Sequence, residues 1–333
     1  MGLSGELKLK NMIKRTLYFS NPAYLSKKDD QLVIKLIDNW NGIVKDKEES
    51  ADVDEIDKYR NRTNQNIIPI EDIGIIILDN QQITITQGLL SSLLENNSAI
   101  VSCDNSHLPV GLFLPLSVNQ IQSERFQAQI ESSVPLRKQL WQQTISTKIR
   151  NQAWLLSQFR IPVNNMLKWA KDVRSGDPDN FEGRAAAYYW KNLFPKELEF
   201  NRDRYGVPPN NLLNYGYAIL RAIVARSLVA SGLLPTLGIH HHNKYNAYCL
   251  ADDIMEPFRP YVDKIVCEVI ENGEDYEELS KSIKEQILGI PVIEIIIGGE
   301  RSPLMVGMQR TTASLAKCFA GEGRKILYPE MYE

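Results

Sequence analysis

Histidines and carboxylates gather in one stretch, residues 238–260, which reads GIHHHNKYNAYCLADDIMEPFRP. Three of the four histidines are consecutive at 240–242, and Asp252, Asp253 and Glu256 follow about ten residues later. On a helix, the two aspartates are spaced i,i+4 and i,i+3 from Glu256, so these carboxylates share a face. Imidazole and carboxylate groups that converge from adjacent segments are suitable ligands for Mg²⁺ or Mn²⁺. The stretch therefore predicts a divalent metal site.

A further acid, Glu182, follows a helix-start signal. Asp177-Pro178-Asp179-Asn180 supplies short polar side chains that cap the free N–H groups of a helix. Glu182 then falls in the first turn, where an acid commonly stabilises the helix dipole by about 0.3–1 kcal/mol. Its position alone therefore leaves two interpretations open, a metal ligand or a partner of the dipole.

Three separated motifs resemble the integrase and endonuclease family of CRISPR adaptation, or spacer acquisition. In that family a Gly-(apolar)-His segment precedes an Asp-(apolar)-(apolar)-Glu-x-(aromatic)-Arg-Pro helix, which stands here as DIMEPFRP at 253–260. The family's third ligand is a glutamate before small residues and an aromatic pair, as in FEGRAAAYYW at 181–190. The tail QRTTASL at 309–315 is similar to members from type II-like systems, which have an RNA-guided single-protein effector. The resemblance covers most of the chain from Leu17 onward.

The resemblance implies that Glu182, His241 and Glu256 are the catalytic metal ligands, with Mg²⁺ or Mn²⁺ as the cofactor. His240 is the alternative imidazole ligand, and His242 is expected to face solvent or DNA. Asp253 is expected either to support a ligand or to bind the metal itself. One metal with three protein ligands is the first interpretation, and a metal pair is the alternative.

The implied reaction is strand transfer, in which the 3′-hydroxyl of a short DNA fragment attacks a phosphodiester of the CRISPR array. Water in place of the hydroxyl gives endonuclease cleavage, a hydrolase reaction. The implied partners are double-stranded DNA (spacer fragment and repeat), a second copy in a homodimer, and a small adaptation protein in a larger hetero-oligomer. The RNA-guided effector nuclease is a further candidate partner.

Two other functions remain in competition with this one. The first is a DNA-binding assembly subunit of the adaptation complex whose metal site is inactive. It predicts normal DNA binding without metal-dependent joining. The second is a metal-dependent hydrolase of a small substrate, which predicts no DNA binding.

Composition and charge are those of an ordinary cytoplasmic protein. The chain has 333 residues, 43% hydrophobic and 24% charged, and a mean hydropathy of −0.28. Without an 18-residue apolar run or an N-terminal apolar signal, we expect no membrane segment. Four widely spaced cysteines without a CxxC pair favour a reduced compartment.

The net charge is −3, yet residues 119–221 hold 15 Lys and Arg against 9 Asp and Glu. Such a region suits either DNA phosphates or a solvated helical surface.

The order of patterns predicts an α+β fold, with a small β-rich domain at residues 12–116 and a larger all-α domain at 117–333. The first is expected to mediate dimer and partner contacts, and the second to carry catalysis and DNA binding. Short β-branched runs such as Ile73–Leu78 predict strands, and Leu17–Ile37 predicts a hairpin with its turn at 26–30. From Ser117 the apolar spacing becomes helical. The acidic Lys45–Arg62 predicts a surface loop, and residues 1–11, ahead of Met12, are left out of the fold prediction.

Three basic side chains required separate interpretation. Arg221 and Arg226 fall in an apolar run that predicts a buried helix, so each needs a partner, either a phosphate or the acid of an internal ion pair. His107 has no second candidate ligand nearby in the sequence. We therefore expect it to be structural.

Overall fold

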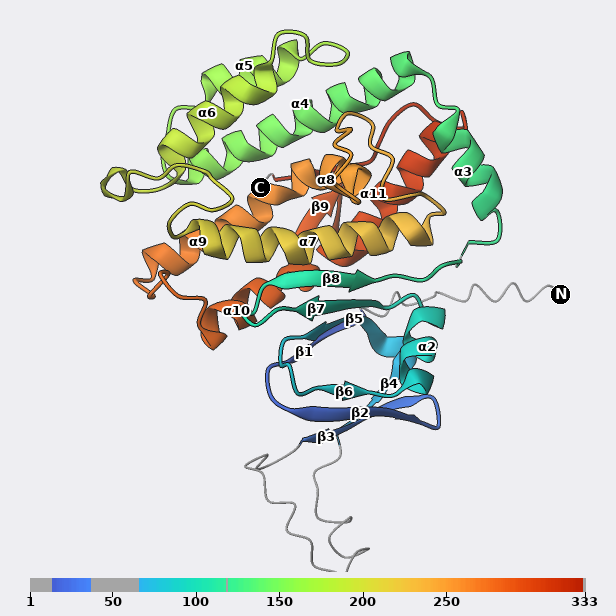
Figure 1. Cartoon of the computed structure of the whole chain (residues 1–333). Helices are drawn as coiled ribbons and strands as arrows, with labels where there is room; N and C mark the ends of the chain where they lie inside the picture. The colour runs from blue at the N-terminus through green and yellow to red at the C-terminus, as the bar shows by residue number, and fades with distance from the viewer. Residues whose placement is uncertain (1–13, 37–65, 118, 332–333) are drawn as a thin grey trace, which may run out of the picture.

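The structure, a computed structural model, describes residues 14–36, 66–117 and 119–331. Its β-rich first part and largely helical second part confirm the α+β class (Figure 1). The predicted acidic loop at 45–62 lies outside the described residues. Nothing tests the predicted domain boundary at 116/117, which stays a prediction.

In its described residues, 14–36 and 66–117, the first part contains two four-stranded sheets and one α-helix. Its elements are β1 (Arg15–Phe19), β2 (Ala23–Lys28), β3 (Gln31–Leu36), β4 (Asn66–Pro69), β5 (Ile73–Leu78), β6 (Thr84–Ile85), α2 (Gln87–Glu95), β7 (Ala99–Cys103) and β8 (Pro109–Phe113). One sheet has the order β1-β5-β7-β8 and the other β4-β3-β2-β6. The β1-β5-β7 pairings are parallel, and β8 closes that sheet in antiparallel register.

The predicted hairpin was placed one strand too early. A hairpin over Leu17–Ile37 with its turn at 26–30 would pair β1 with β3. Instead, β1 pairs with β5, and β3 belongs to a different sheet. The hairpin is β2–β3, and its two turn residues, Asp29 and Asp30, both have positive φ, as the tight turns of two-residue hairpins require. The sequence of β2, AYLSKK, is too polar to stand out as a strand, although Ala23 and Leu25 are fully buried.

The β1-β5-β7-β8 sheet is buried on both faces and joins the two parts of the molecule. Ile75, Ile77 and Val101 belong to the large core with the helices, whereas Ile76 and Ile100 belong to a smaller core with β2, β3 and α2. Successive side chains of a strand point to opposite faces. The apolar runs of β5 and β7 are therefore continuous because each face has its own core to fill.

The second part is a helical bundle with one small sheet. Its elements are α3 (Gln122–Ile130), α4 (Val134–Gln158), α5 (Asn164–Asp172), α6 (Phe181–Leu193), α7 (Asn210–Ala230), α8 (Cys249–Met255), the 3₁₀ turn η3 (Glu256–Phe258), α9 (Arg259–Glu271), α10 (Lys281–Leu288), β9 (Glu294–Ile297), β10 (Glu300–Pro303), α11 (Leu304–Phe319) and β11 (Pro329–Glu330). The expectation of an all-α second part was therefore incomplete. The β10-β9-β11 sheet interrupts it because the run EIII buries Ile295 and Ile297 against α11.

Helix α7 crosses the middle of the molecule between α4 and the β7–β8 edge (Figure 1). It is the one helix in the described residues that is long and apolar enough to cross a membrane, but 78% of that window is buried inside the protein. Both of its arginines have internal partners. Arg221 pairs with Asp252 of α8 at 2.6 Å, and Arg226 donates to the backbone oxygen of Asn97. These contacts favour a partner inside the protein over a phosphate for both arginines: a carboxylate for Arg221 and a backbone carbonyl for Arg226.

Candidate metal centre

The first turn of α6 presents Glu182, as the capping signal predicted. Asn180 is the N-cap in the left-handed region, with φ of 52°, and its side chain accepts from Gly183 N. Asp177 accepts from the backbone N–H groups of Phe181 and Glu182, both at 2.9 Å. A Cβ at position 183 would lie 2.7 Å from the Asn180 oxygen, so any side chain there would displace the cap. These caps fix the position from which the Glu182 side chain extends.

The histidine loop is held by one buried carboxylate, Asp253 of α8. That side chain is fully buried and accepts from the backbone N–H groups of His240, at 2.9 Å, and His241, at 3.3 Å. It also bonds His241 Nδ1 at 2.5 Å. A Cβ on Gly238 would lie 2.8 Å from the Asp253 carboxylate, so the glycine of the Gly-Ile-His segment allows this close approach. Asp253 therefore positions the loop and occupies Nδ1 of His241, so the other ring nitrogen, Nε2, is the one that could bind a metal ion.

His240 and His241 have different environments. The ring of His240 stacks on Trp141 of α4 at 4.1 Å, almost parallel, while His241 meets the same indole edge-on. Burial, with the neighbouring His241, lowers the pKa of His240. The hydrogen bond that His241 donates to Asp253 raises the pKa of His241, although burial opposes this shift. The stacking accounts for the role of His240, so His241 is the better candidate ligand of the two.

Glu256 begins the 3₁₀ turn that separates α8 from α9, where Pro257 and Pro260 interrupt the regular helix. Its buried carboxylate meets two cations: Oε1 accepts from Arg259 Nε at 2.9 Å, and Oε2 lies 2.7 Å from Lys148 Nζ. Burial alone raises the pKa of this carboxyl group, but Arg259 and Lys148 outweigh burial and lower the pKa to about 2. Glu256 is therefore a carboxylate at neutral pH.

Lys148 of α4 connects the two candidate glutamates. Its ammonium donates to Glu182 Oε1 at 2.8 Å and pairs with Glu256 at 2.7 Å. Burial lowers the pKa of Lys148, but the two carboxylates raise it by more, so the net shift is upward. Sequence reasoning missed this residue. The available signal was its place between Ile145 and Ile149 on the buried face of α4, because a lysine on such a face needs an acidic partner.

Behind Glu256, an aromatic network holds α9 in place. The Arg259 guanidinium lies over the Tyr217 ring at 4.4 Å, and the hydroxyl groups of Tyr217 and Tyr189 both donate to Asp263. Burial of Asp263 outweighs these two hydrogen bonds and raises its pKa to about 6. Tyr189, in the motif that follows Glu182, is thus a core residue. The network fixes Arg259, which in turn fixes Glu256.

The structure thus brings the predicted residues together from three elements. Glu182 and Glu256 share Lys148, and His241 is near enough to both glutamates for each to raise its pKa. Within the described ranges, no three His, Cys, Asp or Glu side chains are already arranged to hold a metal ion. His107 is remote from this centre and pairs with Asp79 at 3.0 Å.

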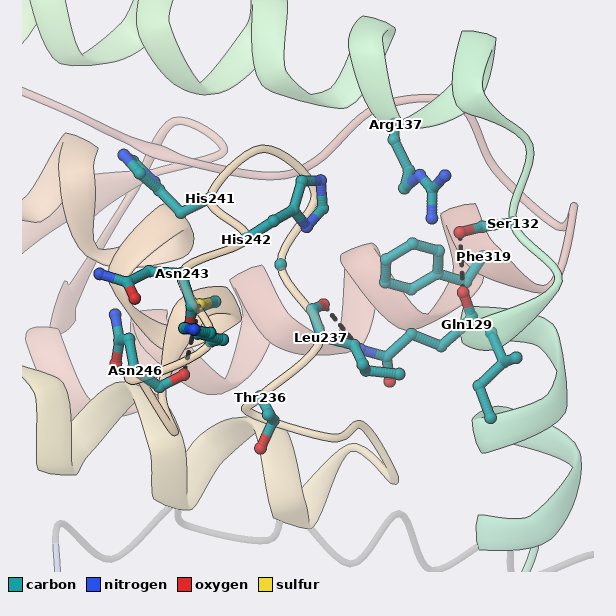
Figure 2. A pocket seen from close by; sticks show the side chains of 14 residues that line it. Gln129, Ser132, Arg137, Thr236, Leu237, His241, His242, Asn243, Asn246 and Phe319 are labelled. Atoms are coloured by element: carbon teal, nitrogen blue, oxygen red, sulfur yellow. Dashed lines mark hydrogen bonds between the residues drawn. The ribbon is translucent and has the colours of Figure 1, made fainter.

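A pocket of about 390 Å³ opens beside His241 and His242 (Figure 2). Arg137 extends into it from α4 toward Phe319, and Lys244 lines the loop side. None of the residues that line it is acidic. The buried amide of Gln129 holds the Leu234–Leu237 wall through hydrogen bonds to Leu234 and Leu237. This preformed, cationic pocket has the charge that suits a phosphate backbone.

Comparison with known proteins decides the family. The model of the family described as CRISPR associated protein Cas1 matches residues 17–286. The chain belongs to the Cas1 family. A relative from Neisseria meningitidis, named CRISPR-associated endonuclease Cas1, is 37% identical over 249 residues, which are 74% of this chain and 81% of that protein. A Saccharolobus solfataricus Cas1 endonuclease is 31% identical over 57% of this chain and 62% of its own length.

Solved structures with the same fold include other Cas1 proteins. A casposase bound to integration product has a TM-score of 0.73 at 21% identity, covering 94% of this chain and 92% of that one. A Cas1 protein from Thermotoga maritima has a TM-score of 0.67 at 17% identity, with coverage of 92% and 98%. A Cas6-RT-Cas1–Cas2 complex has a TM-score of 0.69 at 18% identity, covering 96% of this chain and 36% of that one. The resemblance inferred from three short motifs is therefore confirmed at the level of the Cas1 family, and the fold agrees.

Proposed function

We propose that this Cas1 protein is a metal-dependent DNA endonuclease and integrase that joins short DNA fragments to a CRISPR array. The observation that carries the proposal is that Lys148 joins Glu182 to Glu256, with His241 near enough to both for each carboxylate to raise its pKa. The name of the 37% identical Neisseria relative, an endonuclease, supports the nuclease activity. The casposase with its integration product, which shares this fold, supports strand transfer.

The donor set fits a hard divalent cation with one imidazole ligand. Two carboxylates and a histidine that is oriented by Asp253 match the ligand chemistry of Mg²⁺ and Mn²⁺. Such an ion, when bound, activates the attacking hydroxyl and stabilises charge on the phosphate and the leaving oxygen. Glu182, His241 and Glu256 would hold it.

The protein's own groups supply orientation and charge. Asp253 holds His241 as the tautomer with a proton on Nδ1, so that Nε2 offers its lone pair. Arg259 keeps Glu256 ionised and in one position. Arg137, His242 and Lys244 line the adjacent pocket and would attract the phosphates of the reacting strands. No side chain is required to form a covalent bond with DNA.

We extend the proposal to the assembly in which the protein works. A Cas1–Cas2 complex among the structures of the same fold supports a small adaptation partner. A homodimer on each side of that partner, with double-stranded DNA along the helical part, is the arrangement that we propose. Contacts there would be made chiefly to phosphate, so binding should weaken steeply with salt.

A strand-transfer assay tests the proposal. The protein and its small partner are mixed with a labelled DNA fragment and a plasmid that carries a leader and repeat, in Mg²⁺, Mn²⁺ or EDTA. We expect joining in either metal, none in EDTA, and loss to background in Glu182→Gln and His241→Ala. Glu197→Gln, an exposed acid outside the site, is the matched control and should join like wild type.

DNA binding by each variant, measured without metal, separates the two main functions. If the variants bind DNA and do not join it, the ligand assignment holds. If wild type binds DNA but joins none in any metal, the protein is an assembly subunit with an inactive site. If wild type does not bind DNA, both DNA functions are excluded.

A further inference from the structure

The Lys148 ammonium occupies the space between the two glutamates. Its Nζ lies 2.8 Å from Glu182 Oε1 and 2.7 Å from Glu256 Oε2, and both carboxylates are largely shielded from water. Magnesium binds carboxylate oxygen at about 2.0–2.1 Å, so an ion on these same two oxygens would lie within about 5 Å of Nζ. At that distance in a site with little solvent, a divalent ion and an ammonium repel strongly.

Of the two cations on Glu256, Lys148 is the one that can move. Arg259 is held by stacking on Tyr217 and by its bond to Glu256 Oε1. A lysine ammonium is a point charge on a flexible stem, with no fixed donor geometry to maintain. Among the residues that the structure describes, every hydrogen bond and ion pair of the Lys148 side chain goes to Glu182 or Glu256. Nothing else therefore retains it once these carboxylates are taken by another cation.

We infer that Lys148 is a positioning residue that holds the metal site assembled until the divalent ion arrives, and that the ion takes its place. This inference rests on the metal site of the proposed function. In the metal-free protein, the ammonium keeps Glu182 and Glu256 side by side and offsets their repulsion. When metal binds, the ammonium would leave the space between the two carboxylates.

The exchange predicts that Lys148 and the metal compete. A group that stabilises the metal-free state and loses those contacts on binding must weaken metal affinity. Removing the ammonium should therefore lower the stability of the metal-free protein and raise its affinity for metal. A lysine that served only as a structural ion pair, retained after metal binding, would give the opposite result, because its loss would loosen the ligands.

Mn²⁺ titration of the full-length protein, without DNA, tests the inference. Free Mn²⁺ is measured by electron paramagnetic resonance, and the rise in melting temperature is recorded beside it. We expect Lys148→Met to bind Mn²⁺ roughly 5- to 150-fold more tightly than wild type, the usual range for coupled binding events. It should melt lower without metal and show the larger metal-induced rise. Lys138→Met, an exposed lysine of the same helix, is the charge-matched control.

Lys148→Arg keeps the positive charge, so it tests the inference even if Lys148→Met fails to fold. Its planar guanidinium can donate hydrogen bonds to two carboxylates at once, so a metal ion should displace it less readily than an ammonium. We expect Lys148→Arg to keep the stability of the metal-free protein and to bind Mn²⁺ more weakly than wild type. An Lys148→Arg affinity equal to that of wild type would contradict the exchange.

Glu182→Gln distinguishes failure of the exchange from failure of the metal site. If Glu182→Gln abolishes Mn²⁺ binding while Lys148→Met binds no tighter than Lys138→Met, the site stands and the exchange is wrong. If wild type binds no Mn²⁺, or binds it equally well with Glu182→Gln, the proposed metal site itself is wrong and the inference falls with it.

Discussion

At the residue scale, one carboxylate gives three adjacent histidines different surroundings and favours His241 as the proposed ligand. Asp253 binds the backbone of His240 and His241 but the ring of His241 alone. The ring of His240 instead stacks on Trp141. His242 lines the neighbouring pocket with its side chain exposed. Three identical side chains thus have three different roles because each meets a different neighbour.

We therefore expect Asp253→Asn to weaken the site without removing any proposed ligand. Asparagine keeps the size of the side chain but loses the charge that orients and polarises the His241 ring. Loss of such a supporting group typically costs about 10- to 100-fold in metal affinity or activity. Mn²⁺ affinity and strand transfer should both fall by that amount. Asp252→Asn, the adjacent residue that pairs with Arg221, should leave metal affinity unchanged, and equal losses in the two variants would contradict this role for Asp253.

At the scale of single elements, the capped N-terminus of α6 positions Glu182. Asp177 and Asn180 satisfy three of its free N–H groups, and Glu182 extends from the same turn. The left-handed backbone at Asn180 is disfavoured for most residues but accessible to asparagine and glycine. The cap therefore couples the conformation of Asn180 to the position of Glu182, a proposed metal ligand.

Replacing Asn180 separates the cap from the backbone conformation. Asn180→Ala loses the capping bond and places a Cβ in the left-handed region, so we expect a loss of about 2 kcal/mol in the free energy of unfolding. Asn180→Gly loses only the cap and should cost a few tenths of a kcal/mol. Urea unfolding measures both. Asp179→Ala, which breaks the solvent-exposed pair with Arg174, should cost less than about 1 kcal/mol. An alanine variant as stable as the glycine variant would show that the backbone at 180 is not strained.

At the scale of the whole molecule, a buried polar cluster joins the β-rich part to the helices. Asp79, at the end of β5, accepts from Tyr18 and His107 of the first part and from Lys284 of α10, at 3.0 Å. Asp79 and Lys284 are both buried. This cluster and the β1-β5-β7-β8 sheet, which contributes to both cores, link the β-rich part to the helices.

We expect Lys284→Met to destabilise the protein by about 3–5 kcal/mol, because it leaves a buried carboxylate without its cation. Combining it with Asp79→Asn removes the unpaired charge, so the double variant should lose less than the sum of the single variants. Urea unfolding of the four proteins gives the coupling. Strict additivity of the two losses would mean that the pair does not act together.

The same cluster predicts a loss of stability in acid. Burial raises the pKa of Asp79, but the bonds from Tyr18, Lys284 and His107 lower it by more, to below its ordinary value of 3.8. A carboxyl group with a depressed folded pKa stabilises the protein above its unfolded pKa and loses that contribution as the pH falls. Between pH 6 and strongly acidic solution, wild type should therefore lose more stability than Asp79→Asn.

The sequence by itself determined the family, the α+β class and the three candidate ligands. These inferences rest on local patterns. The capping signal before Glu182 depends on neighbouring residues alone, so the structure reproduces it. Strand β5 was predicted for the same reason, since a continuous β-branched run is a local signal.

Only the tertiary structure decided which side chains meet. The pairing of β1 with β5, the capture of the histidine loop by Asp253 and the placement of Lys148 between two glutamates all join segments distant in the chain. Lysine in a helix is ordinarily a solvated residue, and no local pattern shows that two acids from α6 and η3 will surround it. Packing brings these charges together in a site with little water, where each must find a partner. For that physical reason the metal centre is a property of the folded chain.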